Sequence, residues 1–170
     1  MSVMVILSGK AGSGKDTCGE YLASLGFKRY AFADKLKEIA HLMGWNGEKD
    51  ERGRVLLQEL GTAGRNYDPD MWIKPVIEKM KKEKPKNIVI TDCRFKNEFD
   101  ALVKFAEEHG YEVIPILVKR AGASLPGNLD EHPSEKEFEN FPSSVVISND
   151  GTKGELYKQI DSLGKLYRKV

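Results

Sequence analysis

The stretch Gly9-Lys10-Ala11-Gly12-Ser13-Gly14-Lys15-Asp16-Thr17 follows an apolar run directly and precedes a helical pattern directly. The spacing of Gly9, Gly14 and Lys15 is that of the Walker A loop. Glycines allow backbone N–H groups to converge on phosphate oxygens, and the N-terminus of the next helix adds a favourable dipole. The stretch therefore predicts a phosphate-binding loop after the first strand of an α/β domain.

Within this loop, Lys15 is expected to reach the β- and γ-phosphates of a nucleotide. The alternative is a glycine-rich turn that binds nothing, and the placement between a strand and a helix argues against it. Position 16, commonly Ser or Thr, is Asp, and Thr17 follows it. The usual hydroxyl ligand of Mg²⁺ is missing, so we expect the Asp16 carboxylate to bind the metal, directly or through water. A first-turn acid turned toward Lys10 is the alternative.

Apolar runs alternate with amphipathic stretches along the chain, which favours βα units and a mainly parallel sheet. The expected strands are residues 3–8, 28–32, 87–91, 112–118 and 144–148. The expected helices are residues 15–25, 34–43, 54–63, 70–84, 96–108 and 154–167. We therefore expect a single domain over residues 1–170 with a five-stranded, mainly parallel sheet.

Two segments interrupt this alternation. Residues 32–84 hold three helical patterns, and no strand is expected among them after residue 32. Residues 119–141 hold several Gly, Pro and charged residues with little apolar periodicity. A structureless segment of that length in a compact domain is usually a functional loop. We interpret the first segment as a helical insertion and the second as a mobile lid with few apolar anchors.

The third expected strand ends in Thr91-Asp92-Cys93-Arg94. Because ligands bind beyond the carboxyl ends of parallel strands, Asp92 and Arg94 are expected near the phosphate loop if this strand lies beside the first. Asp92 would order Mg²⁺ or accept a hydrogen bond from substrate, and Arg94 would hold a phosphate. The alternative is that Asp92 caps the helix that follows. Cys93 stands where many hydrolases place a water-activating Glu, which favours transfer to a bound acceptor.

Other side chains are candidates for the same chemistry. Arg65 and Arg120 follow the ends of a predicted helix and a predicted strand, and fixed cations stabilise a migrating phosphoryl group. His132 lacks partners at metal-ligand spacing, so a metal site there is disfavoured. Trp72 is interpreted as a core residue, with stacking on a ligand as the alternative.

The composition narrows the class of protein. The net charge is +1, from 27 basic and 26 acidic residues, and a nucleic-acid-binding domain needs a basic excess or stripe. The apolar run at residues 3–7 is too short for a signal sequence or a membrane span. Cys18 and Cys93 are expected to be reduced thiols. We expect a cytoplasmic protein that binds neither nucleic acid nor membrane.

The motifs together resemble the phage-type deoxynucleoside monophosphate kinases, a branch of the P-loop nucleoside monophosphate kinase superfamily. The resemblance spans nearly the whole chain in scattered motifs. They are the Gly-Lys-Asp-Thr variant at residues 14–17, Phe-Ala-Asp-Lys-Leu-Lys at 32–37, Leu-Gln-Glu-Leu-Gly-Thr at 57–62 with Trp72, Asp-Cys-Arg at 92–94 with Glu98, Glu-His-Pro-Ser-Glu at 131–135 and Ile-Ser-Asn-Asp-Gly-Thr at 147–152.

The resemblance implies a three-layer P-loop kinase fold, ATP and Mg²⁺ as cosubstrates and deoxynucleoside monophosphates as acceptors. It also implies a phage or prophage origin, and hence the host cytoplasm. The expected catalytic residues are Lys15, Asp92, Arg94 and Arg120. The expected ATP-binding residues are Gly9, Lys10, Gly12, Ser13, Gly14, Lys15, Asp16, Thr17 and Asn149. The expected acceptor-binding residues are Asp34, Lys35, Lys37, Gly61, Arg65, Trp72, Asp92, Arg94, Glu98, His132 and Glu135. The expected metal ligands are Asp16 and Asp92.

Other functions compete with this interpretation. A dephospho-coenzyme A or phosphomevalonate kinase would share the fold and differ in the acceptor. A GTPase-like switch protein would carry Asn-Lys-x-Asp after a late strand, and the sequence has no such tetrapeptide. A nucleic-acid-binding ATPase is disfavoured by the near-zero net charge. The accepted bases and assembly into a homodimer are left open.

Overall fold

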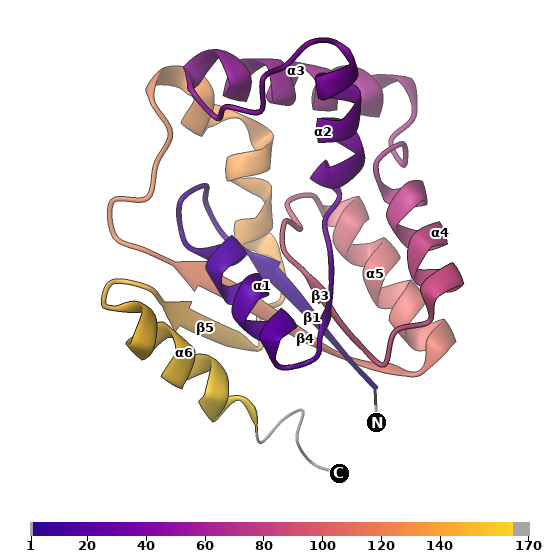
Figure 1. Cartoon of the computed structure of the whole chain (residues 1–170), viewed down its shortest axis with the longest axis vertical. Coiled ribbons are helices and arrows are strands. Elements are labelled where there is room, and N and C mark those ends of the chain that lie inside the picture. Colours follow the sequence, from indigo (N-terminus) through magenta and orange to yellow (C-terminus); the bar gives the residue numbers. More distant parts are fainter. Residues whose placement is uncertain (1, 165–170) are drawn as a thin grey trace.

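The computed structural model describes residues 2–164, which form a parallel sheet covered by helices on both faces (Figure 1). The strands are β1 (Ser2–Ser8), β2 (Lys28–Tyr30), β3 (Asn87–Ile90), β4 (Tyr111–Lys119) and β5 (Val145–Ser148). The helices are α1 (Lys15–Ser24), α2 (Ala33–Leu42), α3 (Glu51–Tyr67), α4 (Ile73–Glu83), α5 (Lys96–His109) and α6 (Lys153–Ser162). The expected α/β class and five-stranded sheet are confirmed.

The sheet order is β2-β3-β1-β4-β5, and every neighbouring pair is parallel. Ile6 of β1 lies opposite Ile90 of β3, so the carboxyl ends of these two strands meet at the same edge. The chain leaves β1 for β2 through α1, whereas β4 pairs with the other side of β1. This change of direction creates the crevice in which open α/β sheets bind ligands.

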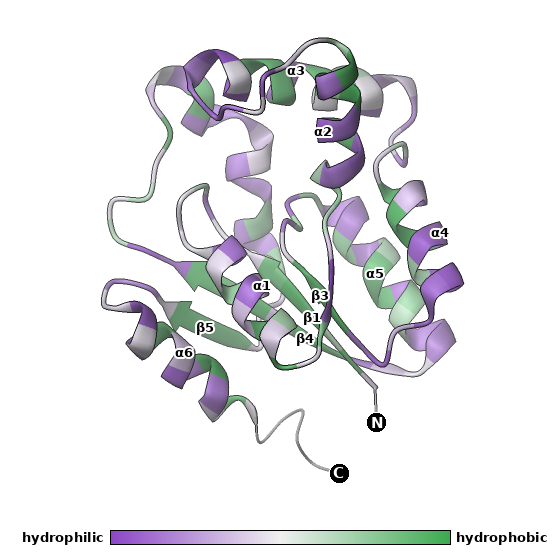
Figure 2. Cartoon of the chain, in the orientation of Figure 1, coloured by the Kyte–Doolittle hydropathy of each residue, from purple (hydrophilic) through white to green (hydrophobic). Residues whose placement is uncertain are grey.

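Two hydrophobic clusters, one on each face, explain why the strands are apolar along their length. Val3, Val5 and Leu7 of β1 pack with α1 and α6, while Met4 and Ile6 pack with α4 and α5. A strand covered on both faces needs apolar side chains at consecutive positions. Figure 2 shows the strands as hydrophobic, with hydrophilic residues on the outer sides of the helices.

Several boundaries differ from those expected. The third helix was expected at residues 54–63 and spans Glu51–Tyr67, because the Asp50 side chain accepts a hydrogen bond from Gly53 N–H and caps it three residues earlier. The fourth helix begins at Ile73 instead of residue 70, and the second strand ends at Tyr30 instead of residue 32. The end of the helix expected at 154–167 lies outside the described residues.

The insertion divides into two parts with different packing. α2 and α3 lie beyond the carboxyl ends of the strands, with α3 across the top of Figure 1. α4 instead contributes Ile73, Val76 and Met80 to the main core and covers the sheet beside α5. The three expected helices are therefore present, but only α2 and α3 stand away from the sheet.

Trp72 joins the two parts of the insertion. Its side chain is buried in the core, and its indole N–H donates a 3.0 Å hydrogen bond to the carbonyl of Gly61 in α3. A Cβ atom at Gly64 would lie 2.4 Å from the Trp72 ring, so α3 approaches the indole closely only because residue 64 is glycine. The core interpretation of Trp72 is therefore confirmed.

The lid segment, residues 119–141, is more ordered than its sequence indicated. It contains three short 3₁₀ helices, η1 (Gly127–Glu131), η2 (Pro133–Glu135) and η3 (Glu137–Asn140). Leu125, Phe138 and Phe141 are buried, and the Phe141 ring stacks on Phe99 of α5 at 5.2 Å. The expectation of few apolar anchors was wrong, because isolated apolar residues without periodicity reach the core here.

No helix within residues 2–164 is both long enough and apolar enough to cross a membrane. Cys18 and Cys93 are buried free thiols.

Candidate functional site

The loop between β1 and α1 has the backbone of a phosphate cradle. Gly9, Gly12 and Gly14 have φ angles of 145°, 76° and 103°, a region that residues with a Cβ rarely adopt. A Cβ at Gly9 would lie 2.3 Å from the Val118 carbonyl oxygen, so the loop packs directly on β4. The glycines therefore allow both the turn of the loop and its close packing against the sheet.

Lys15 is folded into this loop. Its Nζ donates hydrogen bonds of 2.6 Å and 2.7 Å to the carbonyls of Gly9 and Lys10. Burial, and then the nearby Arg94 guanidinium, lower the pKa of Lys15 to about 8. The ammonium group is thus held at the loop in a position where negative charge would stabilise it.

Asn149, which follows β5, supports the loop from the side. Its Nδ2 donates a 3.0 Å hydrogen bond to the Ser13 carbonyl. A Cβ at Gly14 would lie 2.2 Å from the same nitrogen. The contact made by Asn149 is therefore with the loop backbone, from outside the cavity described below.

Asp92 lies at the end of β3, beside the loop as expected, since β3 pairs with β1. Its two carboxylate oxygens accept 2.8 Å hydrogen bonds from the backbone N–H groups of Phe32 and Ala33. Burial raises the pKa of Asp92, and these two donors oppose that shift. The carboxylate thus holds the N-terminus of α2, whereas the capping alternative placed it on the helix that follows Asp92.

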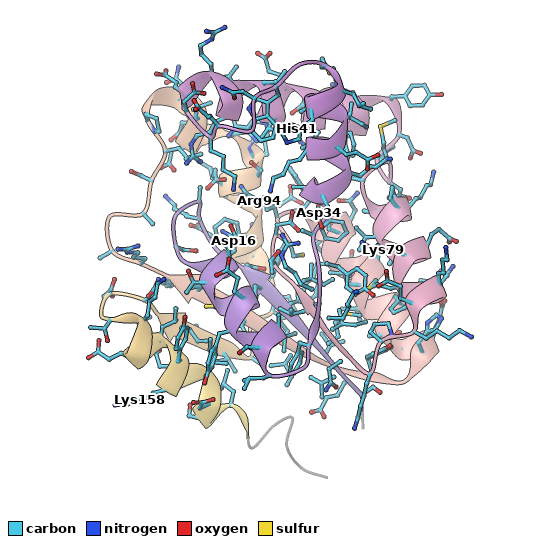
Figure 3. All side chains as sticks on the ribbon, in the orientation of Figure 1. Asp16, Asp34, His41, Lys79, Arg94 and Lys158 are labelled. Atoms are coloured by element: carbon cyan, nitrogen blue, oxygen red, sulfur yellow. The ribbon has the colours of Figure 1, made fainter. Side chains whose placement is uncertain are left out.

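Asp16 has the opposite surroundings. It is exposed in the first turn of α1, next to Thr17, and lines the cavity together with Arg94 (Figure 3). Mg²⁺ in phosphoryl-transfer sites is commonly held by one or two carboxylates plus substrate phosphates. Among residues 2–164 no cluster of three or more His, Cys, Asp or Glu could hold a metal alone. The exposed Asp16 carboxylate is therefore a group of this loop that could hold Mg²⁺ together with a bound phosphate.

Arg94 and Glu135 connect the end of β3 to the lid segment. Arg94 Nη1 forms an ion pair with Glu135 Oε1 and donates a 3.4 Å hydrogen bond to the Ser134 carbonyl. Glu135 Oε2 accepts a 2.7 Å hydrogen bond from the Ala11 N–H of the phosphate loop. Lys10 forms a further ion pair with Asp130 of the lid at 3.3 Å.

Glu98 occupies the first turn of α5 behind Arg94. Its Oε2 accepts hydrogen bonds from the backbone N–H groups of Arg94 at 2.8 Å and Phe95 at 3.0 Å. Burial raises the pKa of Glu98 to about 7, although these donors act in the opposite direction. The Arg65 guanidinium lies 4.2 Å from the centre of the Phe95 ring. Glu98 therefore fixes the turn from which Arg94 projects.

One cavity of about 500 Å³ brings most of these residues together. The predicted site residues that line it are Gly12, Gly14, Lys15, Asp16, Thr17, Lys37, Gly61, Arg65, Trp72, Asp92, Arg94, Glu98, Arg120, His132 and Glu135. Those that do not line it are Gly9, Lys10, Ser13, Asn149, Asp34 and Lys35. Asp34 pairs with Arg29 at 3.2 Å and Lys35 with Glu38 at 2.9 Å, so both carry out surface contacts.

The structure adds residues that the sequence interpretation missed. Those are Arg29, Lys49, Arg54 and Phe95, which also line the cavity. Leu36, Leu57 and Gln58, which belong to the motifs at 32–37 and 57–62, line it as well. Arg54, Gln58, Gly61 and Arg65 recur every three or four positions on α3, which places them on one helix face. That spacing was available in the sequence and could have identified the face of α3 that lines the cavity.

The cavity is strongly cationic compared with the whole chain. Among the described residues it is lined by eight Lys and Arg side chains and four Asp and Glu side chains, while the net charge of the chain is +1. Three of the four acids, Asp92, Glu98 and Glu135, accept hydrogen bonds from backbone N–H groups. An excess of cations gathered in one cavity indicates an anionic ligand.

Residues 46–160 match the family model described as deoxynucleotide monophosphate kinase. This chain belongs to that family. Among curated proteins, it is 31% identical over 150 residues to the uncharacterized protein ORF77 of Ictalurid herpesvirus 1 (strain Auburn), covering 85% of this chain and 63% of that protein. It is 27% identical over 160 residues to ORF76 of the same virus, again covering 63% of the relative. The chain thus spans less than two thirds of the length of these curated relatives.

Solved structures agree on the fold. A candidate kinase from Chloroflexus aurantiacus superposes with a TM-score of 0.59 at 12% identity, covering 99% of this chain and 98% of that one. Shikimate kinase from Aquifex aeolicus gives 0.51 at 13% identity, covering 99% and 100%. The expected P-loop kinase fold is confirmed.

Proposed function

We propose that this kinase transfers the γ-phosphoryl group of ATP to a deoxynucleoside monophosphate, giving ADP and a deoxynucleoside diphosphate. The observation that carries the proposal is the single cavity that joins Lys15 of the phosphate loop to the cationic face of α2 and α3. A donor and an acceptor that both carry phosphate need such a cavity, with cations at both ends.

The donor would bind at the phosphate loop. The backbone N–H groups of the loop and the N-terminus of α1 would hold the phosphates of ATP, with Lys15 on the β- and γ-phosphates. Asp16 would hold Mg²⁺, which neutralises phosphate charge when bound. Arg94 and Arg120, which both line the cavity, would stabilise the charge of the migrating group.

The acceptor would bind between α2, α3 and the start of α5. Leu36, Leu57 and Trp72 give this end of the cavity apolar surface for a base. Lys37, Lys49 and Arg54 give it cations for the phosphate, and neither Lys37 Nζ nor Lys49 Nζ has a hydrogen-bond or ion-pair partner within residues 2–164. Little covalent chemistry is required of the protein, because positioning and charge neutralisation supply most of the rate.

The test is ADP formation from ATP with each deoxynucleoside and ribonucleoside monophosphate in turn, followed by chromatography of the product. Dephospho-coenzyme A and phosphomevalonate serve as rival acceptors on the same fold. We expect diphosphate product from at least one deoxynucleoside monophosphate. Activity confined to a rival acceptor would keep the kinase and replace the proposed substrate.

A further inference from the structure

The lid segment places a carboxylate inside the phosphate-binding loop. The Glu135 side chain is fully buried, and its two oxygens bind different partners, Ala11 N–H and Arg94. A backbone N–H of a phosphate loop and a guanidinium are both typical donors to phosphate oxygens. Glu135 therefore occupies two donors that a phosphoryl group bound in this loop would use.

Positive charges surround Glu135, as they would surround a bound phosphate. Its carboxylate acts to raise the pKa of Lys15, in opposition to burial and to Arg94, so it contributes negative charge beside the loop lysine. An unpaired buried carboxylate would cost several kcal/mol in desolvation. The ion pair with Arg94 and the 2.7 Å hydrogen bond from Ala11 offset this cost.

The rest of the lid ties Glu135 to both ends of the cavity. Asp130 pairs with Lys10 of the phosphate loop at 3.3 Å, and the Leu129 carbonyl accepts a 3.2 Å hydrogen bond from Gln58 of α3. Phe138 and Phe141 anchor the following residues in the core. The lid residues after Glu135 are therefore fixed in the core, whereas those before it are held mainly by polar contacts. A displacement of Glu135 would break these polar contacts and leave the apolar anchors in place.

We propose that Glu135 is a positioning residue that competes with nucleotide phosphate for Ala11 N–H and Arg94, so that Arg94 is released to the phosphoryl group when nucleotide displaces the carboxylate. The inference rests on the proposed function in taking a nucleotide phosphate as the ligand of the loop. A side chain that competes with the ligand lowers the apparent affinity for the nucleotide, because only the fraction of molecules in which the side chain has left the site can bind it.

The test is the affinity for ADP, measured by calorimetry without metal, in wild type and Glu135→Gln. Glutamine keeps the shape of the side chain and removes the charge that holds Arg94. We expect ADP to bind about three- to tenfold more tightly to this variant, since the competing anion is gone. Glu139→Gln is the matched control, because it removes the same charge from an exposed position of the same lid and should leave the affinity unchanged.

Unchanged or weaker ADP binding by a folded Glu135→Gln protein would overturn the inference. Wild-type protein gives an independent reading through hydrogen exchange of residues 132–136, where Glu135 N–H donates to the His132 carbonyl at 2.9 Å. ADP should speed exchange in this segment, and unchanged or slower exchange would overturn the inference. Wild-type protein that binds no ADP would overturn the proposed function as well, whereas normal ADP binding unaffected by Glu135→Gln would remove only the inference.

Discussion

The phosphate-binding loop and the lid segment meet at Glu135 but are held in place by different means. The loop depends on its own backbone, with three glycines at positive φ and a lysine bonded to its own carbonyls. The lid is held by contacts with distant parts of the chain, which its own side chains Phe138, Phe141 and Glu135 make. A locally determined segment is visible in a motif, whereas a segment held by tertiary contacts is visible only in the structure.

The largest effect is expected for Phe138→Ala, which removes an apolar anchor of the lid. A Phe to Ala change at a buried site typically costs about 3–5 kcal/mol of the free energy of unfolding. Phe138 is 3% exposed, so we expect a loss in this range by urea denaturation. Phe138→Leu is the control and should lose clearly less. A loss below about 1 kcal/mol for Ala would mean that the lid is not anchored through this ring.

The second effect concerns chemistry at the loop. Lys15→Ala should lower kcat by about 10²–10³-fold, by analogy with the removal of a preorganised transition-state donor. The fold should persist, because Lys15 belongs to neither of the two hydrophobic clusters that hold the sheet and helices together. Lys81→Ala, on the surface of α4, is the control for loss of a lysine. Turnover within threefold of wild type would contradict the assignment of the donor site to this loop.

The third effect is a pH dependence of the free energy of unfolding of the ligand-free protein, caused by Lys15. Lys15 has a pKa of about 8 in the folded protein and an ordinary value of 10.5. Between these values the unfolded chain holds a proton that the folded chain has lost, so stability rises with pH. Wild type should therefore gain roughly 3 kcal/mol relative to Lys15→Met between pH 8 and pH 10.5. Parallel pH profiles of urea unfolding for the two proteins would show that Lys15 is not desolvated in solution.

The smallest effect is expected at Asp16, the exposed acid of the loop. Asp16→Asn should raise the Mg²⁺ concentration for half-maximal rate severalfold, because a full negative charge near the metal is lost. Binding of ADP without metal should be unchanged, and binding of Mn²⁺ to the ADP complex should weaken. An unchanged metal dependence would assign the metal to Thr17 or to Asp92.

The sequence predicted the phosphate loop, five strands and the helices because each depends on local spacing. It placed Asp92 at the correct edge of the sheet but did not predict the backbone N–H groups that the Asp92 carboxylate binds. β2 lies beside β3, and Thr91 N–H donates to the Tyr30 carbonyl at 3.2 Å, which brings the Phe32 and Ala33 N–H groups to the Asp92 carboxylate. Sheet order decides this contact, and no local pattern encodes it.

The end of the cavity that we propose for the acceptor shows the same limit. Lys37, Gly61 and Arg65 line the cavity. Asp34 and Lys35, which belong to the same motif at 32–37 as Lys37, face the surface instead. On a helix, residues next to each other in sequence point in directions about 100° apart, so a continuous motif cannot lie wholly in one cavity. Lys49 was missed because it lies in the connection before α3, where no periodicity marks its direction.

The contact between Gly64 and Trp72 has a consequence for how this chain can change over evolutionary time. With a Cβ at residue 64 only 2.4 Å from the indole ring, a substitution at 64 would force the ring or α3 to shift while Trp72 is present. Loss of the indole would have to come first, or in the same step, before residue 64 could vary. Positions 64 and 72 should therefore covary in an alignment of homologues, with side chains at 64 found only where residue 72 is smaller than tryptophan.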